Sequence, residues 1–550
     1  MTRLLWIVAL LVLGCGFSRG AENPFLPARD PVPLLAAIEA ETPAFEVPSG
    51  VTGITVPHHL LAADLIARGF WAASAGDYDR IIVISPDHFR KVSKRFATTR
   101  EDLVTVLGTL ASDGAAVDRL AASPLVEVLP TIEAEHGVMA VAPFAAHFFP
   151  RAKVVPLLAS IYSTQADWAA MAETLRPLLT ERTLIVQSTD YSHYRPAGEA
   201  VQRDQESISA ITVGDPAAID PMLQPSHMDS KAAQFIQLTL QRALGSKPVI
   251  LANRNSVEYG TSAKETTSYV VTAFIRDAAE ATAFTYDDQQ KLMFAGDVLL
   301  GRYFLPALRD PGAWGMIRDT VLGITRKMPL VINLEGVVLD LAVSGVDSTA
   351  HVMMMDDVAP VLAALNVTAA SLANNHANDL GPEGRAETVK HLTSIGVTPL
   401  EHGAVADLGS VRLLGINFVG GKMVGEAIAD PDDLGWVCEL HAAPPLVAFV
   451  HWGPEYVTSA SDKERKIADS LAQCGVSLIV GNHSHQAADA IEALRGGAVQ
   501  TVYSLGNFIF DQTSPRGTGA LLEVRVFAQG TIAARLVPIP NLFELSRSHP

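Results

Sequence analysis

The feature that most constrains this chain is a short, largely apolar run that ends at two histidines. Residues 477–480 predict a buried strand, and the run stops at Gly481. His483 and His485 follow, one residue apart. In an α/β sheet such residues lie at the carboxyl edge, where both imidazoles can offer a ring nitrogen to one cation. The alternative is that they are two surface histidines in a polar loop. The residues that follow the other strands of the chain distinguish between these two interpretations.

Four upstream stretches repeat the pattern of an apolar strand followed by side chains that bind metals. KLMFAGD ends in Asp297, and LVINLEG carries Asn333 and Glu335. TAASLANNHANDLG carries Asn374, Asn375, His376 and Asp379, and LVAFVHWGPEY carries His451 and Glu455. Oxygen and imidazole ligands without a thiolate suit divalent Mn, Fe or Zn. We therefore predict a centre of two metal ions, in which carboxylates bridge ions roughly 3.5–4 Å apart and a free imidazole acts as general acid.

The order of these motifs resembles a known family. GDVLLGR, NLEG, SLANNHANDLG, HWGPEY and GNHSH followed by YSLGNFIFDQ look like the motif set of the CapA family of poly-γ-glutamate capsule-synthesis proteins, over residues 291–541. The resemblance implies a calcineurin-like metallophosphoesterase fold, which is an α/β sandwich. It also implies His376 as the protonated partner, which Asp379 would orient, and as metal ligands Asp297, Glu335, Asn375, His451, His483 and His485.

One position departs from the pattern of ordinary metallophosphoesterases. Their first motif reads Asp-x-His, and here Leu299 stands where that histidine would be. We therefore expect one of the two metal positions to be weak or empty.

The length of the chain predicts two domains. A chain of 550 residues exceeds what one hydrophobic core usually organises, and its hydrophobic content of 49% is that of a globular protein. We expect an N-terminal domain over residues 24–275, a linker over 276–290 and a C-terminal domain over 291–545. The net charge of −18 argues against a nucleic-acid partner. It does not exclude a polyanionic substrate, because divalent ions can invert the sign of a site locally.

The first twenty residues predict an export signal. Arg3 precedes an apolar run from Leu4 to Leu13, which is shorter than the ~20 residues that a membrane-spanning helix needs. Cleavage after Gly20 is one interpretation, and lipoprotein processing at Cys15 is another. An uncleaved anchor is the third. Both main alternatives place the protein in the periplasm or cell envelope, with attachment to the membrane if Cys15 is lipidated.

Two further cysteines, Cys438 and Cys474, could form a disulfide in an exported protein. Cys474 lies in a helical pattern just before a buried strand, where a small apolar thiol is common. We therefore expect the two thiols to be unpaired, with a disulfide as the alternative.

The N-terminal half also alternates strands with helical segments, which predicts an α/β fold. RIIVISPDHF, AKVVPLLASIY and RTLIVQSTDYSH are its clearest strands, and GITVPHHL adds another short apolar run. These segments end near His58 and His59, His88, and Asp190 with His193. Hydrogen-bonded core or loop histidines remain the alternative to a metal or catalytic site.

Taken together, VPHH, ISPDHF, EAEHGVMAVAPF, STDYSHY and SVEYGTSAKETTSYVVTAF resemble the Memo family, called AmmeMemoRadiSam system protein B in bacteria. The resemblance implies a fold similar to class III extradiol ring-cleaving dioxygenases. The metal-binding positions of the family would fall on His58, His88 and a cysteine, and the alignment places Lys231 at or near that cysteine. The pairs Glu135 with His136 and Asp190 with His193 are retained.

The lysine makes an N-terminal metal doubtful. An ammonium group beside two imidazoles would repel a cation, so we expect weakened metal affinity there. The alternative is that Lys231 points to solvent and that Glu135, His136 or His193 completes the site.

These observations predict an exported protein with a metal-dependent, hydrolase-like C-terminal domain. Its substrate would be a phosphate ester or an exopolymer such as poly-γ-glutamate, and capsule-synthesis proteins would be its partners. Two alternatives remain open. One is an envelope component that binds or hands on an anionic polymer without catalysis, and the other is a redox activity of the N-terminal half on a small aromatic molecule.

Overall fold

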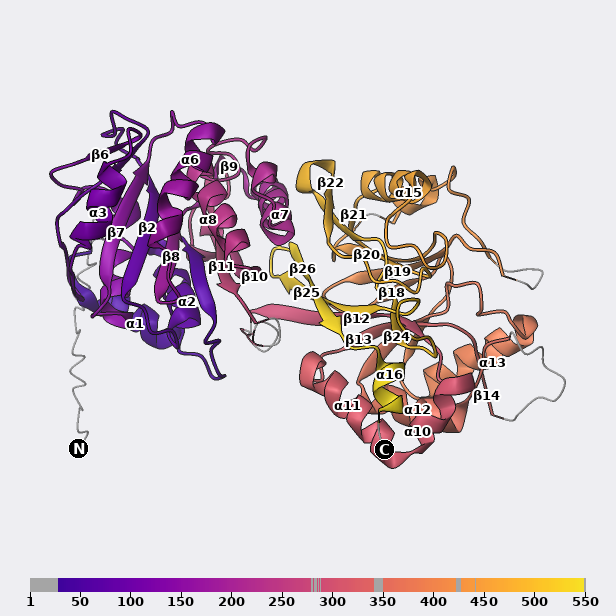
Figure 1. The fold of residues 1–550 in the computed structure, drawn as a ribbon. Helices are drawn as coiled ribbons and strands as arrows, with labels where there is room; N and C mark the ends of the chain where they lie inside the picture. The colour runs from indigo at the N-terminus through magenta and orange to yellow at the C-terminus, as the bar shows by residue number, and fades with distance from the viewer. Residues whose placement is uncertain are drawn as a thin grey trace, which may run out of the picture.

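A computed structural model describes residues 28–277, 280, 284, 286, 288–340, 350–421, 427–440 and 442–548. Figure 1 shows two sheet-based halves side by side, the N-terminal half in indigo to magenta and the C-terminal half in pink to yellow. The expected export signal, including Cys15, and part of the expected linker lie outside the described residues. Within the described ranges, no helix is both long enough and apolar enough to cross a membrane.

The N-terminal half is built on one mixed sheet of nine strands. Its centre is parallel, with neighbours in the order β1 (Val51–Val56), β8 (Thr183–Ser188), β2 (Arg80–Pro86) and β7 (Lys153–Ala159). The sheet continues beyond β1 with β11 (Thr266–Ile275), which pairs with β10 (Lys247–Asn255) and β9 (Tyr191–Arg195), and beyond β7 with β3 (Phe96–Thr98) and β6 (Val126–Val128). A separate hairpin joins β4 (Leu103–Thr105) to β5 (Gly108–Leu110).

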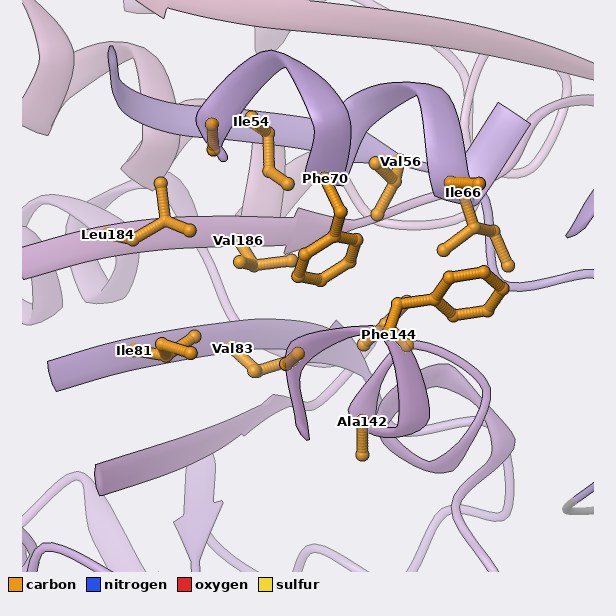
Figure 2. Close-up of a cluster of buried hydrophobic side chains, with 14 of the residues drawn as sticks. Ile54, Val56, Ile66, Phe70, Ile81, Val83, Ala142, Phe144, Leu184 and Val186 are labelled. Carbon is orange, nitrogen blue, oxygen red and sulfur yellow. The ribbon is translucent and has the colours of Figure 1, made fainter. Parts of the chain in front are cut away.

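Helices cover both faces of this sheet, which is why its central strands are continuous apolar runs. On one face, Phe70 of α2 (Ala63–Ala73) and Phe144 of α5 (Ala142–Phe148) pack near Val83 and Val186, as Figure 2 shows. The alternate residues of the same strands, such as Ile82 and Ile185, belong to the core on the opposite face. That face is covered by α6 (Gln165–Leu175), α7 (Ala197–Val213) and α8 (Lys231–Ala243). The remaining helices of this half are α1 (Pro31–Ala40), α3 (Gly114–Ala121) and α4 (His136–Met139).

The C-terminal half is a sandwich of two sheets. The first has the order β17 (Thr398–Leu400), β16 (Val367–Ser371), β13 (Leu330–Leu334), β12 (Gln289–Val298), β25 (Gly519–Phe527) and β26 (Ile532–Ile539), with β24 (Asn507–Ile509) also paired to β12. The second has the order β18 (Val405–Asp407), β19 (Arg412–Asn417), β20 (Leu446–His451), β21 (Val476–Asn482), β23 (Val499–Val502) and β22 (Glu492–Leu494). A small parallel pair joins β14 (Val337–Leu339) to β15 (Val352–Met354).

Apolar side chains between the two sheets form the centre of the sandwich. Phe294 of β12 and Phe449 of β20 meet with ring centroids 5.7 Å apart. The outer face of the first sheet packs on α11 (Pro311–Thr325), α12 (Met355–Ala364), α13 (Gly381–Ser394) and α16 (Leu542–Arg547), with α10 (Leu305–Arg309) beside α11 and α12. The outer face of the second sheet packs on α14 (Gly435–Cys438) and α15 (Asp462–Gln473). The expected fold class, two α/β halves of which the second is a sandwich, is confirmed.

The two halves meet where α7 lies beside β26 (Figure 1), and the interface combines apolar side chains, Phe527 and Ala533, with polar contacts. Gln205 of α7 exchanges two hydrogen bonds with the backbone of Ile532, with lengths of 2.8 and 3.0 Å. The buried Arg525 of β25 donates to the carbonyl of Ile250, at 3.4 Å, and to Gln289, at 3.0 Å. These paired backbone and side-chain groups tie the C-terminal sheet to β10 and α7 of the N-terminal half.

The expectation of two unpaired thiols is wrong. Cys438 ends α14 and Cys474 follows α15, and the structure joins them in a disulfide with their Cα atoms 4.1 Å apart. The helix predicted before Cys474 is confirmed as α15. What the pattern could not show is that α14 packs against α15 and brings the second thiol alongside.

Candidate metal centres

The strand-end residues of the C-terminal half gather where the carboxyl edges of the two sheets meet. Asp297 is the penultimate residue of β12 and lies beside Asn333 of β13, its partner in register. His451 is the last residue of β20, and Asn482 of β21 is its neighbour in register, just before His483. Parallel strands place their carboxyl ends together, so residues far apart in sequence share one edge.

Three of these side chains converge closely enough to share an ion. Glu335, His451 and His483 each offer one ligand atom, and these atoms lie within 4.8 Å of one another. The amide of Asn333 donates to Asp297, at 2.8 Å, and to Glu335, at 3.2 Å, and so fixes both carboxylates. The three converging residues are buried. The arrangement is a set of two imidazoles and one carboxylate fixed by an outer amide.

The other proposed ligands surround this group. The Oδ1 atom of Asn375 lies 2.8 Å from Nε2 of His451. The Nδ1 atom of His485 lies 3.1 Å from Asp297 Oδ2 and 2.8 Å from Asn507 Oδ1. The structure therefore brings all six proposed ligands of the C-terminal half to one edge.

The charges at this edge favour a cation. Burial, followed by the nearby Asp297 carboxylate, raises the pKa of Glu335 well above its usual range. Burial also keeps the pKa of His451 well below its usual range and lowers the pKa of His483 to about 4, so both rings are neutral and free to coordinate at neutral pH. Asp297 is fully buried, and its Oδ2 atom meets Nδ1 of His485 at 3.1 Å. These observations fit divalent ions with oxygen and imidazole ligands.

His376 and Asp379 form a pair beside the proposed ligands. The Nδ1 atom of His376 lies 2.9 Å from Asp379 Oδ2, which also accepts the backbone N–H of His351 at 2.7 Å. The side chain of His376 is 18% exposed, more than those of His451 and His485. The carboxylate thus holds the ring in one orientation at the open side of the site.

One residue of this site was missed in the sequence. The ring of His351 stacks on His376 with centroids 3.6 Å apart, and its Nε2 atom lies 2.9 Å from Nη1 of Arg302. Asp511 in turn holds Arg302 through two contacts of 3.1 and 2.5 Å. His351 follows no predicted strand and belongs to none of the motifs, so no local signal could have identified it.

The loop after β21 has an unusual backbone. His483 and His485 have φ angles of 93° and 58°, a region that side chains other than glycine rarely adopt. Gly481 just before them has no room for a side chain, because a Cβ atom there would lie 2.0 Å from the carbonyl oxygen of Tyr503. Ser484 donates to the carbonyl of Gln486 and so points away from the ligands. Tertiary packing imposes this local conformation, as is frequent at functional sites.

Leu299 occupies the position expected for a first-motif histidine. It is fully buried in the core beneath the first sheet, among residues that include Phe304 and Phe508. It therefore supplies no ligand and points away from the cluster of donors.

The strand-end residues of the N-terminal half line a separate pocket of about 920 Å³. His58 follows β1, His88 follows β2, and Asp190 follows β8, so the carboxyl edge of the parallel strands again collects the polar residues. Among the other proposed residues, His136 and His193 also line the pocket, while Glu135 lies behind it and contacts the Nδ1 atom of His88 at 2.5 Å.

Lys231 does not take the position expected of it. It begins α8 and lines the pocket, but its ammonium group donates to the carbonyl of Asp220 and lies 5.6 Å from the ring centroid of Trp168. The side chain that faces the histidines is Asp229, two residues earlier, with Oδ2 at 3.0 Å from His58 Nε2. The expectation that the lysine occupies the third metal position is therefore wrong.

Comparisons with known proteins match each half to a different family model. Residues 35–273 match the family model described as Memo-like protein. Residues 291–425 and 434–512 match the model described as bacterial capsule synthesis protein PGA_cap.

Individual relatives agree with this division. The chain is 29% identical over 277 residues to the PGA biosynthesis protein CapA of Bacillus subtilis, covering 46% of this chain and 72% of that protein. It is 24% identical over 291 residues to a probable polyglutamine synthesis accessory protein of Mycobacterium tuberculosis, covering 41% and 75%. It is also 23% identical over 232 residues to a MEMO1 family protein of Saccharolobus solfataricus, covering 40% and 81%.

Proposed function

On the premise that the chain carries a Memo-like domain followed by a PGA_cap domain, we propose that it acts in capsule synthesis. Its activity there would be that of a metal-dependent hydrolase, and the product of the pathway would be an anionic capsule polymer. The bond that it cleaves would be a phosphate ester or a linkage of an exopolymer such as poly-γ-glutamate. The names of the relatives, which refer to polyglutamate or capsule synthesis, support the polymer. The reaction is supported by the site itself.

One observation carries the hydrolytic proposal. The group of Glu335, His451 and His483 lies at the same sheet edge as a histidine that a carboxylate orients, His376 with Asp379. A site that only binds a metal has no need of an oriented imidazole beside the ligands. A site that also moves a proton does, because general acids must be held within reach of the leaving group.

The residues would divide the work as follows. Glu335, His451, His483 and Asn375 would hold one divalent ion, and Asp297, Glu335 and His485 would hold a second. When bound, such ions activate water and stabilise the negative charge that develops in the transition state. His376 would donate a proton to the leaving group from Nε2, because Asp379 accepts the hydrogen on Nδ1. Asn333 would keep the Asp297 and Glu335 carboxylates in place through its two donated hydrogen bonds.

A second candidate function is a polymer-binding component without catalysis. Leu299 favours it, because a buried leucine in place of a ligand leaves the ion beside Asp297 with fewer protein donors. Metal that is retained without turnover on phosphodiesters or poly-γ-glutamate would support this second function over the first.

Replacing His483 with alanine should remove at least one equivalent of metal and abolish metal-dependent turnover, because the group of ligands loses a neutral imidazole at its centre. The measurement is metal analysis of protein purified without chelators, with phosphodiester and poly-γ-glutamate assays beside it. The exposed His147 of α5 offers a matched control, and His147→Ala should change neither quantity. Wild-type metal content in His483→Ala would contradict the ligand assignment.

Export remains a proposal from the sequence. If the run from Leu4 to Leu13 is a signal, the mature chain should be found outside the cytoplasm and should begin at or near Ala21, or at a lipidated Cys15. Amino-terminal sequencing and intact mass decide between the two starts. A full-length cytosolic product would contradict both proposed starts. It would also exclude an extracellular capsule polymer as the substrate.

A further inference from the structure

We propose that Arg302 binds an oxyanion of the substrate, a carboxylate or phosphate group next to the bond that is cleaved, on the same side of the C-terminal centre as His376. The inference rests on the proposed function, because it names the group of the substrate that this site recognises. Arg302 ends the motif GDVLLGR and belongs neither to the proposed metal ligands nor to the proton-transfer pair. The proposal depends on how its guanidinium group is held and on what lies beside it.

Two neighbours hold the guanidinium group of Arg302. Its Nε and Nη2 atoms donate to the carboxylate of Asp511 at 3.1 and 2.5 Å, and its Nη1 atom lies 2.9 Å from Nε2 of His351. A guanidinium group can only donate, so Nε2 of His351 is the acceptor and the ring hydrogen lies on Nδ1. Burial, with His376 and Arg302 nearby, lowers the pKa of His351 to about 2, which keeps this ring neutral.

The backbone around Arg302 is fixed as well. Arg302 has a φ angle of 46°, in the left-handed region that residues other than glycine rarely adopt. Gly301 just before it has no room for a side chain, because a Cβ atom there would lie 2.6 Å from the carbonyl oxygen of Val352. The backbone N–H of Tyr303 donates to the carboxylate of Asp511 at 3.3 Å. Packing therefore imposes the position of Arg302, as is frequent at functional sites.

Part of the guanidinium group remains available to a ligand. Of its five N–H hydrogens, three are directed at Asp511 and His351, and the other two have no partner among the described residues. The side chain of Arg302 is 28% exposed, whereas that of Asp511 is 1% exposed. The buried carboxylate thus orients the guanidinium group, and the exposed part keeps two donors for a group that arrives from solvent.

His351 connects Arg302 to the proton-transfer pair. The ring of His351 stacks on His376 with centroids 3.6 Å apart and planes 15° apart, and its backbone N–H donates to Asp379 at 2.7 Å. Glu335, His351 and His376 each offer a ligand atom, and these atoms lie within 4.8 Å of one another. Arg302 is therefore one side chain away from both the proposed general acid and a proposed metal ligand. An anion that it binds would lie on the side of the leaving group.

The donors select the class of ligand. Guanidinium N–H groups bind carboxylates and phosphates through charge-assisted hydrogen bonds, which are stronger than those between neutral groups. Asp511 balances the charge of Arg302, so recognition would depend on the direction of the two remaining N–H groups rather than on net charge. In γ-linked polyglutamate, the matching group is the α-carboxylate beside each γ-amide. In a phosphate ester, it is an oxygen of the phosphate.

A cavity beside Arg302 leaves room for a longer substrate. Tyr303 and Asp511, the two residues next to the guanidinium group, line a cavity of about 630 Å³ together with Pro306, Phe543 and Arg547. This volume lies within the usual range of ligand pockets. It is large enough for the next unit of a polymer, whereas a compact phosphate ester would leave it empty. The cavity therefore favours a carboxylate polymer as the source of the oxyanion.

The test is ligand binding to the full chain loaded with Mn(II), measured by calorimetry. The ligands are γ-linked tetraglutamate, the same peptide with its α-carboxylates converted to amides, and inorganic phosphate. Arg302→Lys keeps a cation for Asp511, and Arg302→Gln removes it. In both variants the preference for the free carboxylates over the amides should shrink by about 10–100-fold, while the bound metal is unchanged. Arg309→Gln is the matched control, because Arg309 is 60% exposed and pairs with Asp357, and it should keep the wild-type preference.

The pair of peptides separates a contact from a structural effect. Damage to the fold would weaken both peptides equally, and that result would overturn the proposal. A fall of the phosphate affinity by the same factor in both variants, with the carboxylate preference unchanged, would identify the oxyanion as phosphate. Wild-type behaviour toward all three ligands would overturn the proposal, and so would loss of the bound metal from both variants.

Turnover is measured separately, so that the two proposals can fail independently. Binding that depends on Arg302 without any hydrolysis would contradict the proposed hydrolase and support this inference. Hydrolysis by both Arg302 variants at the wild-type kcat/KM would support the hydrolase and overturn this inference.

Discussion

Replacing His376 with alanine is expected to lower turnover by about 10²–10⁴-fold while the bound metal stays at the wild-type level. The reason is the geometry of the pair, in which Asp379 holds the Nδ1 side of the ring at 2.9 Å and leaves Nε2 for the leaving group. The measurement combines steady-state kinetics with metal analysis of the same protein. Loss of transition-state stabilisation should appear in both kcat and kcat/KM.

The choice of substrate makes this prediction sharper. A leaving group such as p-nitrophenolate needs no protonation, so His376→Ala should slow its ester less than it slows an alkyl ester. Asp379→Asn can still accept a hydrogen bond and should cost less than His376→Ala. The structure also offers a rival role, because Glu335, His351 and His376 lie close enough together to hold an ion. Loss of metal from His376→Ala would establish His376 as a metal ligand and would contradict its role as the general acid.

Replacing Glu523 with glutamine is expected to destabilise the protein by about 3–5 kcal/mol, which is the usual cost of removing one partner of a buried ion pair. Glu523 is 1% exposed and contacts Nε of Arg525 at 2.7 Å, Nζ of Lys291 at 3.4 Å and the guanidinium of Arg535. Without this carboxylate two guanidinium groups, those of Arg525 and Arg535, would remain close together, beside Lys291, whose pKa burial lowers to about 7. The measurement is the free energy of unfolding by denaturant.

The pH dependence of the same group provides an independent check. Burial opposes ionisation, but Arg525, Arg535 and Lys291 together lower the pKa of Glu523 to about 2, against an ordinary value of 4.5. Because the pKa is lower in the folded state, the stabilisation is complete above about pH 4.5 and is lost as the pH falls toward 2. The difference between wild type and Glu523→Gln should therefore shrink across that interval.

An exposed ion pair supplies the control for this prediction. Glu492 contacts Arg465 at 2.5 Å, but its side chain is 40% exposed. Glu492→Gln should change the free energy of unfolding by only about 0–1 kcal/mol, since water screens such pairs. A Glu523→Gln protein as stable as Glu492→Gln would contradict the prediction that the buried cluster stabilises the protein.

The sequence by itself determined which strands are buried and which polar residues follow them. An apolar run that stops at a loop is a local property, and in a parallel sheet it places the next residues at the carboxyl edge. Asp297, Glu335, His451 and His58 could be found in this way, and the order of motifs was enough to indicate both families. The two-domain α/β class followed from the same pattern together with the length of the chain.

The tertiary structure alone decided which distant residues meet. His351 reaches His376 although no strand-end pattern precedes it, and Cys438 reaches Cys474 because two helices pack together. Asp229 rather than Lys231 faces the N-terminal histidines, because the Lys231 ammonium group donates to the carbonyl of Asp220. Periodicity reports the direction of a side chain relative to its own strand or helix. The order of strands, the packing of helices and the path of loops set the distance between elements, and these arise from contacts that no local pattern records.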